Sequence, residues 1–190
     1  YLGSLGKSTR KDMRRKWRAP GPQVEWRSHI DDVLPDVMRL YEASLARSDL
    51  QWERLPPAYF TGILQQLGDR ALCALYWIDD TLVAFNLVLL DEHRLIDKFF
   101  GHDLALTREY NLYFRSWLVN VDYCIRNGIG LYECGQAGYA SKIRLGCTFE
   151  GNTLFFRHRN RLINNALKLV KLFIRPDRHD PAMAAAISES

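Results

Sequence analysis

The stretch Leu131–Phe149, LYECGQAGYASKIRLGCTF, decides the fold of this chain. A short apolar run ends at Gly135, a turn with a second glycine follows, and a short helix then carries Lys142 and Arg144. Glycine adopts backbone angles that other residues resist, so a sharp corner between a strand and a helix fits here. Because open α/β sheets bind ligands beyond the carboxyl ends of their strands, this corner predicts a binding site.

Three β-rich runs precede this corner, at 71–78, 81–90 and 94–101. Short polar connections between such runs predict antiparallel hairpins. The second run is apolar almost throughout, which predicts a central strand that is covered on both faces. Asn86 and Asp97 are polar residues inside these runs, and a buried polar side chain needs a partner. Each is therefore either a structural hydrogen-bonding residue or a site residue.

Helical periodicity and helix-stopping residues predict the elements around these strands. The expected order is a basic helix before Pro20, a strand at 23–28, helices at 31–47 and 56–67, the three-stranded meander, a helix at 108–127, a strand that enters Gly135, a short helix, a strand at 153–158 and a helix at 161–174. The helix at 108–127 makes a crossover, so the strand after it should pair in parallel. The fold class is α/β (α+β), with a mixed, mostly antiparallel central sheet flanked by helices.

The helix at 108–127 is predicted to face the core with one apolar stripe. The residues of that stripe are Tyr110, Phe114, Trp117, Leu118, Val121 and Ile125. They recur with the period of an α-helix, and a glycine at 128 follows the last turn.

The composition is that of a globular domain, with 190 residues of which 47% are hydrophobic and 25% charged. No apolar run approaches the ~18–20 residues of a membrane-spanning helix. The amino end is basic but lacks the apolar core of a signal peptide. The four cysteines show no metal-ligand spacing and lie in apolar runs, which predicts buried, reduced thiols in a cytoplasmic protein. Since the chain begins at Tyr1, a fragment of a longer protein is the alternative left open.

Charge is distributed unevenly along the chain. Residues 1–18 carry a net charge of +6, residues 19–156 carry −6, and residues 157–190 carry +4. The first helix places six cations on one stripe: Lys7, Arg10, Lys11, Arg14, Arg15 and Arg18. This stripe predicts either a surface for phosphates or acidic partners, or a solvated helix face.

The order of elements, with these residues in it, resembles the GNAT acyltransferase fold. It looks most like the FemAB-like and BioF2-like branch, bacterial proteins related to the Fem peptidyltransferases of peptidoglycan synthesis. Four patches carry the resemblance: LGKSTRKDMRRKWR at 5–18, FFGHD at 99–103, LYF at 112–114 and YECGQAGYASKIRLG at 132–146.

The resemblance implies a single GNAT-like acyltransferase domain at 1–176, with a tail at 177–190. It implies transfer of an acyl group from acyl-CoA to an amine of a small-molecule or cell-envelope acceptor, without a metal. There is one departure, because the junction GHDLALTREYN lacks the paired glycines with which most GNAT enzymes hold the pyrophosphate of coenzyme A. Fem enzymes share this departure and use aminoacyl-tRNA, so that donor is the alternative.

Acyl transfer to an amine requires removal of a proton, stabilisation of the oxyanion and neutralisation of the donor's phosphates. Asp103 is the candidate general base or amine orienter, with capping of the next turn as its structural alternative. The resemblance places Lys142 at the acyl carbonyl or at a donor phosphate, and the alternative is a solvated lysine. Tyr139 is the candidate for returning a proton to the leaving group, and core packing is its alternative.

A second set of residues is predicted to bind the donor. Its members are Gly101, His102, Gln136, Arg144, Arg10 and Arg14. Two further possibilities stay open for the chain as a whole. It is one half of a protein with a second GNAT domain upstream, or it binds tRNA through its basic first helix and the helix that begins at Arg161. Neither DNA binding nor a transmembrane segment is expected.

Overall fold

The computed structural model describes residues 1–47, 54–135, 138–150 and 157–170, the last with side chains up to residue 167. The chain divides into two compact units. The first contains Tyr1–Leu2 and Arg10–Gly135, and the second contains Gly3–Thr9 and the described residues after Gly135. Among the described residues, no helix combines the length and the apolar character that crossing a bilayer requires.

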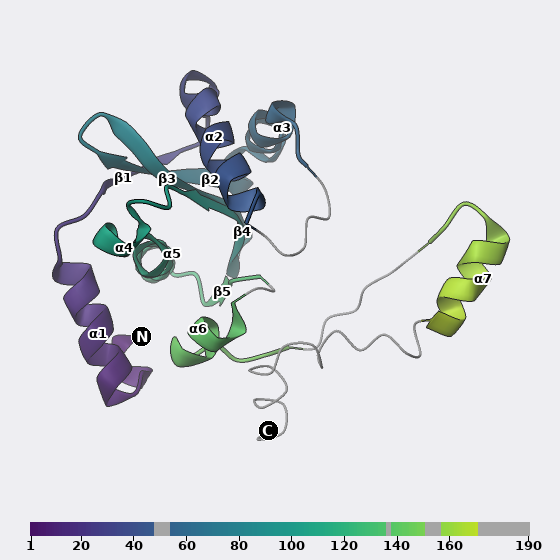
Figure 1. Ribbon diagram of the computed structural model, residues 1–190. Helices are drawn as coiled ribbons and strands as arrows, with labels where there is room; N and C mark the ends of the chain where they lie inside the picture. The colour runs from purple at the N-terminus through teal and green to yellow at the C-terminus, as the bar shows by residue number, and fades with distance from the viewer. Residues whose placement is uncertain (48–53, 136–137, 151–156, 171–190) are drawn as a thin grey trace. The chain divides into compact units, whose positions relative to one another are not determined.

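The first unit is a sheet with helices on both of its faces (Figure 1). Along the chain its elements are the later turns of α1 (Lys7–Arg18), β1 (Gln23–Arg27), η2 (Asp31–Val33), α2 (Leu34–Leu45), α3 (Pro57–Leu67), η3 (Gly68–Arg70), β2 (Ala71–Ile78), β3 (Thr81–Leu90), β4 (Arg94–His102), α4 (Thr107–Tyr110), α5 (Leu112–Arg126) and β5 (Leu131–Glu133). These bounds confirm the predicted meander and the strand before it.

The described strands form one sheet in the order β1-β2-β3-β4-β5. The first three pairings are antiparallel, and β4 pairs in parallel with β5. The predicted change of direction after the crossover helix is therefore confirmed. The mixed α/β fold is confirmed as well, and β3 is buried along most of its length between β2 and β4.

Side chains that alternate along β2 form the two halves of the core. Cys73 and Leu75 point into a cluster with α2 and α3, whereas Ala74 and Tyr76 point into a cluster with α5. Figure 1 shows α2 and α3 on one face of the sheet and α5 on the other. Burial raises the pKa of the Cys73 thiol to about 12, so this cysteine is a core residue rather than a nucleophile.

The pairing of β4 with β5 covers only the first part of β4. The register runs from Arg94↔Leu131 to Ile96↔Glu133, and β4 continues from Asp97 to His102 beyond it. On its other side β4 carries a bulge, because Leu87 pairs with Phe99 and Val88 pairs with Asp97. Bulges change the direction of side chains and are frequent beside functional sites. Asp97 therefore lies where a bulge and the end of a strand pairing coincide.

The helix predicted at 108–127 is interrupted. α4 ends at Tyr110, Asn111 adopts a left-handed conformation with φ of 52°, and α5 begins at Leu112. Asparagine tolerates this conformation better than most residues. The predicted apolar stripe is partly wrong, because Ile125 is 64% exposed. The buried face of α5 instead includes Ser116 and Asn120, whose polar side chains the stripe left out.

The last turns of α1 are held against α5. Arg115 Nη2 donates to the carbonyl oxygens of Lys16 (3.0 Å) and Ala19 (2.6 Å), which lie at the end of the helix. Lys16 Nζ lies 4.6 Å from the centroid of the Phe114 ring and 2.5 Å from an oxygen of Asp12. The predicted basic helix is thus confirmed as an element, and part of its charge is paired inside the helix.

The described residues of the second unit form two helices after Gly138. These are α6 (Tyr139–Arg144) and α7 (Arg161–Val170). Gly138 has φ of 71° and starts α6, which confirms the predicted corner between a glycine turn and a short helix. Most of the strand expected at 153–158 lies outside the described residues, as do the end of the helix expected at 161–174 and the tail at 177–190.

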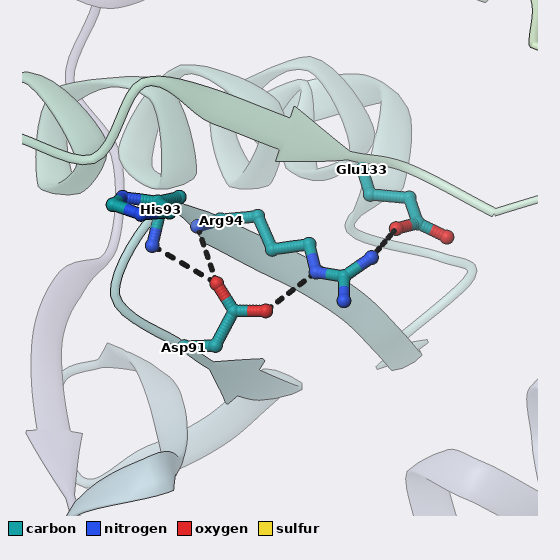
Figure 2. Close-up of polar contacts among 4 residues, drawn as sticks. All are labelled: Asp91, His93, Arg94 and Glu133. Atoms are coloured by element: carbon teal, nitrogen blue, oxygen red, sulfur yellow. Dashed lines mark hydrogen bonds and ion pairs between the residues drawn. The ribbon is translucent and has the colours of Figure 1, made fainter.

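A surface network connects the hairpin between β3 and β4 to Glu133, the last residue of β5 (Figure 2). Asp91 accepts hydrogen bonds from the backbone N–H groups of His93 and Arg94, both at 2.9 Å, and from Arg94 Nε at 2.5 Å. Arg94 Nη1 lies 3.7 Å from Glu133 Oε2. The Arg94 side chain and these backbone bonds lower the pKa of Asp91 to about 2.

Asp91→Asn should remove a contribution to stability that depends on pH. Because the folded protein holds the pKa of Asp91 below its unfolded value, the contribution is present above about pH 4 and is lost as pH falls toward about 2. Urea unfolding at a series of pH values should show the wild type more stable than Asp91→Asn at neutral pH, with the difference vanishing near pH 2. A difference that is independent of pH would assign the effect to the turn geometry instead.

Candidate functional site

Four polar side chains meet at the place where β4 leaves β5. They form the polar cluster, which consists of Asn86 on β3, Asp97 on β4, Asn120 on α5 and Tyr132 on β5. Asn86 and Asn120 are fully buried, and Asp97 and Tyr132 are partly buried. Four separate elements therefore supply one site inside the first unit.

The Asp97 carboxylate is the common acceptor of this cluster. Asn86 Nδ2 donates to Asp97 Oδ1 at 2.7 Å, and the Tyr132 hydroxyl donates to Asp97 Oδ2 at 2.8 Å. Asn86 Nδ2 also lies 3.3 Å from the Phe99 carbonyl oxygen, so Asn86 spans the bulge of β4. Donors on both oxygens hold the carboxylate in one orientation.

Tyr132 is suited to donate a hydrogen bond rather than to lose its proton. Burial, followed by the nearby charge of Asp97, raises the pKa of its hydroxyl well above the usual value. Its ring packs against Trp117 with centroids 4.9 Å apart, and the Trp117 indole N–H donates to the Tyr1 hydroxyl at 2.9 Å. The phenol is therefore fixed by packing on one side and by Asp97 on the other.

Asn120 links the cluster to the crossover helix. Its Nδ2 donates to Asn86 Oδ1 at 2.7 Å and to the Tyr132 hydroxyl at 3.1 Å. Its Oδ1 is buried and has no hydrogen-bond partner among the described residues. A buried acceptor without a partner is costly, so its retention beside Asp97 is typical of a site that a ligand or a water completes.

The arrangement around Asp97 can bind and accept a proton from an amine. The oriented carboxylate of Asp97 and the neighbouring amide oxygen of Asn120 are both acceptors, which suits a ligand with several N–H groups. Among the described strands, none pairs with β4 beyond Ile96 on the β5 side, and an amide-bearing chain could bind there in the manner of an added strand. Both properties belong to residues of the first unit.

Asp103 lies just beyond β4, and its side chain and carbonyl oxygen accept hydrogen bonds within the turn that follows. Its Oδ1 accepts from the Ala105 N–H at 2.8 Å, and its carbonyl oxygen accepts from the Thr107 hydroxyl at 2.6 Å. This geometry matches the turn-capping alternative. A carboxylate in this turn also occupies a backbone donor that a phosphate would need. The turn therefore offers a pyrophosphate one backbone donor fewer, and it also lacks the paired glycines.

Gly101 and His102 occupy the end of β4. A Cβ atom on Gly101 would overlap the Phe85 ring and lie 3.0 Å from the carbonyl carbon of Leu40, so close packing requires this glycine. His102 stacks on Phe100 with centroids 4.9 Å apart, and its backbone N–H donates to Ser44 Oγ at 3.3 Å. Burial, and then the charge of Arg47, lower the pKa of His102.

The remaining predicted residues after Gly135 belong to the second unit. Lys142 is 7% exposed, so the alternative of a solvated lysine is wrong. Tyr139 is partly buried and its ring lies 5.7 Å from that of Phe149, whereas Arg144 is exposed. Gln136 lies outside the described residues. Donor binding by Gln136 and Arg144, and catalysis by Lys142 and Tyr139, stay predictions.

The two arginines predicted on the first helix are both found on α1, where Arg10 is partly buried and Arg14 is exposed. Phosphate binding by Arg10 and Arg14 stays a prediction. Within the described ranges, no group of three or more His, Cys, Asp or Glu side chains is arranged to hold a metal ion.

Sequence reasoning singled out Asn86 and Asp97 but missed Asn120 and Tyr132. Asn120 had a detectable signal, because it follows Ser116 by four residues on a helix face that is otherwise apolar. Tyr132 had none, since a tyrosine in a short strand is an ordinary core residue.

Tyr132→Phe should destabilise the protein by about 1–3 kcal/mol, because it removes the hydrogen bond that the hydroxyl donates to Asp97 and the one that it accepts from Asn120. The ring packing against Trp117 is retained, so the loss reports the hydroxyl alone. Urea unfolding measures it. Tyr123→Phe is the matched control, because Tyr123 lies about one turn after Asn120 on α5 and packs against Trp26, and it should change stability by less than about 0.5 kcal/mol. Equal losses for the two variants would contradict a special role of the cluster.

The sequence and the fold are similar to those of known proteins. A family model described as an acetyltransferase (GNAT) domain matches residues 7–142, which include the whole polar cluster. No curated protein matches the sequence.

Three solved structures illustrate the shared fold. A possible acetyltransferase from Clostridium difficile has 12% identity and a TM-score of 0.52, over 74% of this chain and 99% of that one. Ribosomal-protein-alanine N-acetyltransferase from Brucella melitensis has 15% identity and a TM-score of 0.51, over 72% and 98%. A predicted acetyltransferase with acetyl-CoA from Clostridium acetobutylicum has 8% identity and a TM-score of 0.52, over 73% and 100%.

These structures have the same fold, and the family model covers most of the sequence. The chain therefore belongs to the GNAT acetyltransferase domain family, and the protein is a transferase.

Proposed function

We propose that this protein is an N-acyltransferase that moves an acyl group from acyl-CoA to an amine of a small-molecule or cell-envelope acceptor. The observation that carries the proposal is the Asp97 carboxylate, which Asn86 and Tyr132 orient at the end of the pairing between β4 and β5. Membership of the acetyltransferase family supports a CoA thioester as the donor. The FemAB-like and BioF2-like character of the chain is part of this proposal.

Residues of the first unit would have separate roles in acyl transfer. Bound acyl-CoA supplies an activated thioester carbonyl. The β4 edge beyond Ile96 would hold the amide-bearing arm of the donor, and Asp97 would hold the acceptor amine. As the C–N bond forms and the C–S bond breaks, Asp97 takes the proton that the amine loses. Tyr132 remains protonated and keeps Asp97 in place.

Asp97 and Asp103 are the two carboxylates available for this step on β4 and just after it. Asp97 is the better-positioned carboxylate, because side chains from other elements orient it, whereas Asp103 Oδ1 receives the Ala105 N–H of its own turn. Asp103 remains the second candidate. Its expected contribution is to fix the connection between β4 and α4.

Lys142 and Tyr139 on α6 are proposed as the groups for the acyl carbonyl and the leaving group, respectively. Arg144, Arg10 and Arg14 are proposed for the donor's phosphates. Since the turn at Asp103 does not suit a pyrophosphate, cations elsewhere must neutralise these phosphates.

Lys142→Met should lower kcat/KM at least about tenfold, because it removes a cation without emptying the buried space that the side chain fills. The melting temperature should stay within roughly 3 °C of the wild-type value. Steady-state kinetics and thermal melts measure the two effects. A large fall in melting temperature at unchanged kcat/KM would make Lys142 a structural residue.

One observation favours a second candidate function. The carboxylate of Asp103 occupies the turn in which a CoA pyrophosphate would need free backbone donors. A Fem-like aminoacyl transferase, which uses aminoacyl-tRNA, does not need that turn. A non-catalytic GNAT half that binds the donor or the acceptor for a second GNAT domain is the remaining alternative.

The test is binding and transfer with defined donors. Calorimetry and thermal shift with acetyl-CoA, longer acyl-CoAs and bulk tRNA identify the donor, because a ligand that binds the folded state raises the melting temperature. Release of the free CoA thiol in the presence of a panel of amines measures transfer. We expect binding of a CoA ester and thiol release that depends on the amine. Salt-sensitive tRNA binding without CoA binding would favour aminoacyl transfer, and absence of both would favour the non-catalytic half.

A further inference from the structure

The start of α7 presents arginines and aliphatic side chains together. The α7 surface consists of Arg157, Arg159, Arg161, Leu162 and Ile163, all of which are exposed. Leu162 is 79% exposed and Ile163 is 44% exposed. Acyl transfer as proposed above uses none of these residues, so their arrangement requires a separate explanation.

Local hydrogen bonds hold the residues before α7 against its first turns. Asn160 caps the helix, because its Oδ1 accepts from the Leu162 N–H at 2.8 Å. The Asn160 N–H donates to His158 Nδ1 at 3.0 Å, and the His158 N–H donates to Asn164 Oδ1 at 3.2 Å. The chain before the helix is thereby tied to the first turns of α7. The arginines at 157, 159 and 161 are held beside the helix start rather than on a random tail.

The cations of the α7 surface form no ion pair with an acidic side chain of the described residues. No ion pair joins Arg157, Arg159 or Arg161 to any residue in the described parts of the chain. A hollow of about 580 Å³ is lined by these three arginines together with His158, Asn164 and Asn165. Its described lining contains no carboxylate, so the hollow is a place where an anionic phosphate group would be favoured.

The helix separates polar from apolar side chains. Arg161, Asn164 and Asn165 follow the i, i+3, i+4 spacing of one face, while Ile163, Ala166 and Leu167 follow the same spacing on another. An amphipathic helix with exposed aliphatic residues and arginines at its start is typical of a helix that lies in a membrane interface. Nucleic acid would pair with the arginines but would leave Leu162 and Ile163 in water. A bilayer with anionic headgroups satisfies both groups.

We propose that the α7 surface docks the protein on an anionic phospholipid bilayer. Arg157, Arg159 and Arg161 contact the lipid phosphates, and Leu162 and Ile163 enter the boundary between the headgroups and the acyl chains. The arginines favour a membrane surface with anionic lipids over a neutral one. The aliphatic side chains favour a bilayer over a nucleic acid. The proposal does not depend on the identity of the acyl donor.

The test is flotation of the full chain with vesicles of phosphatidylcholine alone or of phosphatidylcholine mixed with phosphatidylglycerol. We expect binding to the mixed vesicles that weakens with salt, and little binding to phosphatidylcholine alone. Arg157→Gln/Arg159→Gln/Arg161→Gln should reduce binding on the order of 100-fold. Leu162→Asn/Ile163→Asn, which keeps every charge, should reduce it by roughly tenfold or more. Thermal melts confirm that each variant is folded.

A matched control removes the same charge elsewhere. Lys7→Gln/Lys11→Gln/Arg18→Gln deletes three exposed cations of α1 and should leave vesicle binding within about twofold. Equal loss in this control would reduce the effect to net charge and overturn the proposal. It would also be overturned by absence of vesicle binding, or by tRNA binding that requires the arginines but not Leu162 and Ile163. A dimer that Leu162→Asn/Ile163→Asn converts to a monomer, without vesicle binding, would assign the surface to a second copy.

Discussion

Asp97→Asn is expected to lower kcat/KM for acyl transfer at least about 100-fold, the usual range for losing a positioned general base. The substitution is nearly isosteric, and its amide oxygen can still accept one of the hydrogen bonds that Asn86 and Tyr132 donate. The carboxamide that replaces the carboxylate cannot accept the proton of the amine. Stability should therefore fall by no more than about 2 kcal/mol, and binding of the donor should be retained. Steady-state kinetics, urea unfolding and calorimetry with acyl-CoA measure the three quantities.

Asp103→Asn is the matched comparison, because it changes the other carboxylate at this end of the sheet by the same atoms. If Asp103 serves its turn, its variant loses roughly 1 kcal/mol of stability and keeps kcat/KM within about tenfold. The reverse pattern, with Asp103→Asn inactive and Asp97→Asn active, would move the base to Asp103 and leave the polar cluster as a structural network.

The fold could be predicted from the sequence to the extent that each element carried its own signal. The strands at 71–78 and 81–90 are observed at those residues, because their apolar runs are bounded by polar turns. The change to parallel pairing followed from the crossover helix alone. The break at Asn111 did not follow, since a single left-handed residue is decided by the packing of α4 and α5 rather than by periodicity.

The candidate site was less predictable, because its residues become neighbours only in the folded chain. Asn86 and Asp97 are eleven residues apart. Asn86 pairs with Phe100 and Asp97 pairs with Val88, on either side of a bulge that no local pattern in the sequence predicts. Tyr132 reaches Asp97 from the parallel strand. Asp103 stood out because it follows a strand, yet its geometry is that of a turn residue. The sequence therefore identified Asp97 as a strand residue that needs a partner, but it did not predict which residues contact it.

Gly101→Ala is expected to destabilise the protein by about 3 kcal/mol, whether or not a donor is present. A Cβ at this position would overlap the Phe85 ring and press on the backbone of α2 at Leu40, so both the sheet and the helix would have to move. Forcing a methyl group into a packed core typically costs about 1–3 kcal/mol, and contact with backbone places this case at the upper end. Thermal melts should show a fall of roughly 6–12 °C.

Gly62→Ala is the control, because the nearest atom to a Cβ on Gly62 is the flexible end of Gln66, at 4.0 Å. That substitution lies inside α3 and should stabilise the protein by up to about 1 kcal/mol. A role of Gly101 in binding the donor predicts a different result for Gly101→Ala. If the glycine serves chiefly to let a donor approach β4, Gly101→Ala keeps the melting temperature of the free protein and loses the increase that acyl-CoA produces. Since Phe85 and Leu40 already occupy the space beside Gly101, the structure favours the loss of stability.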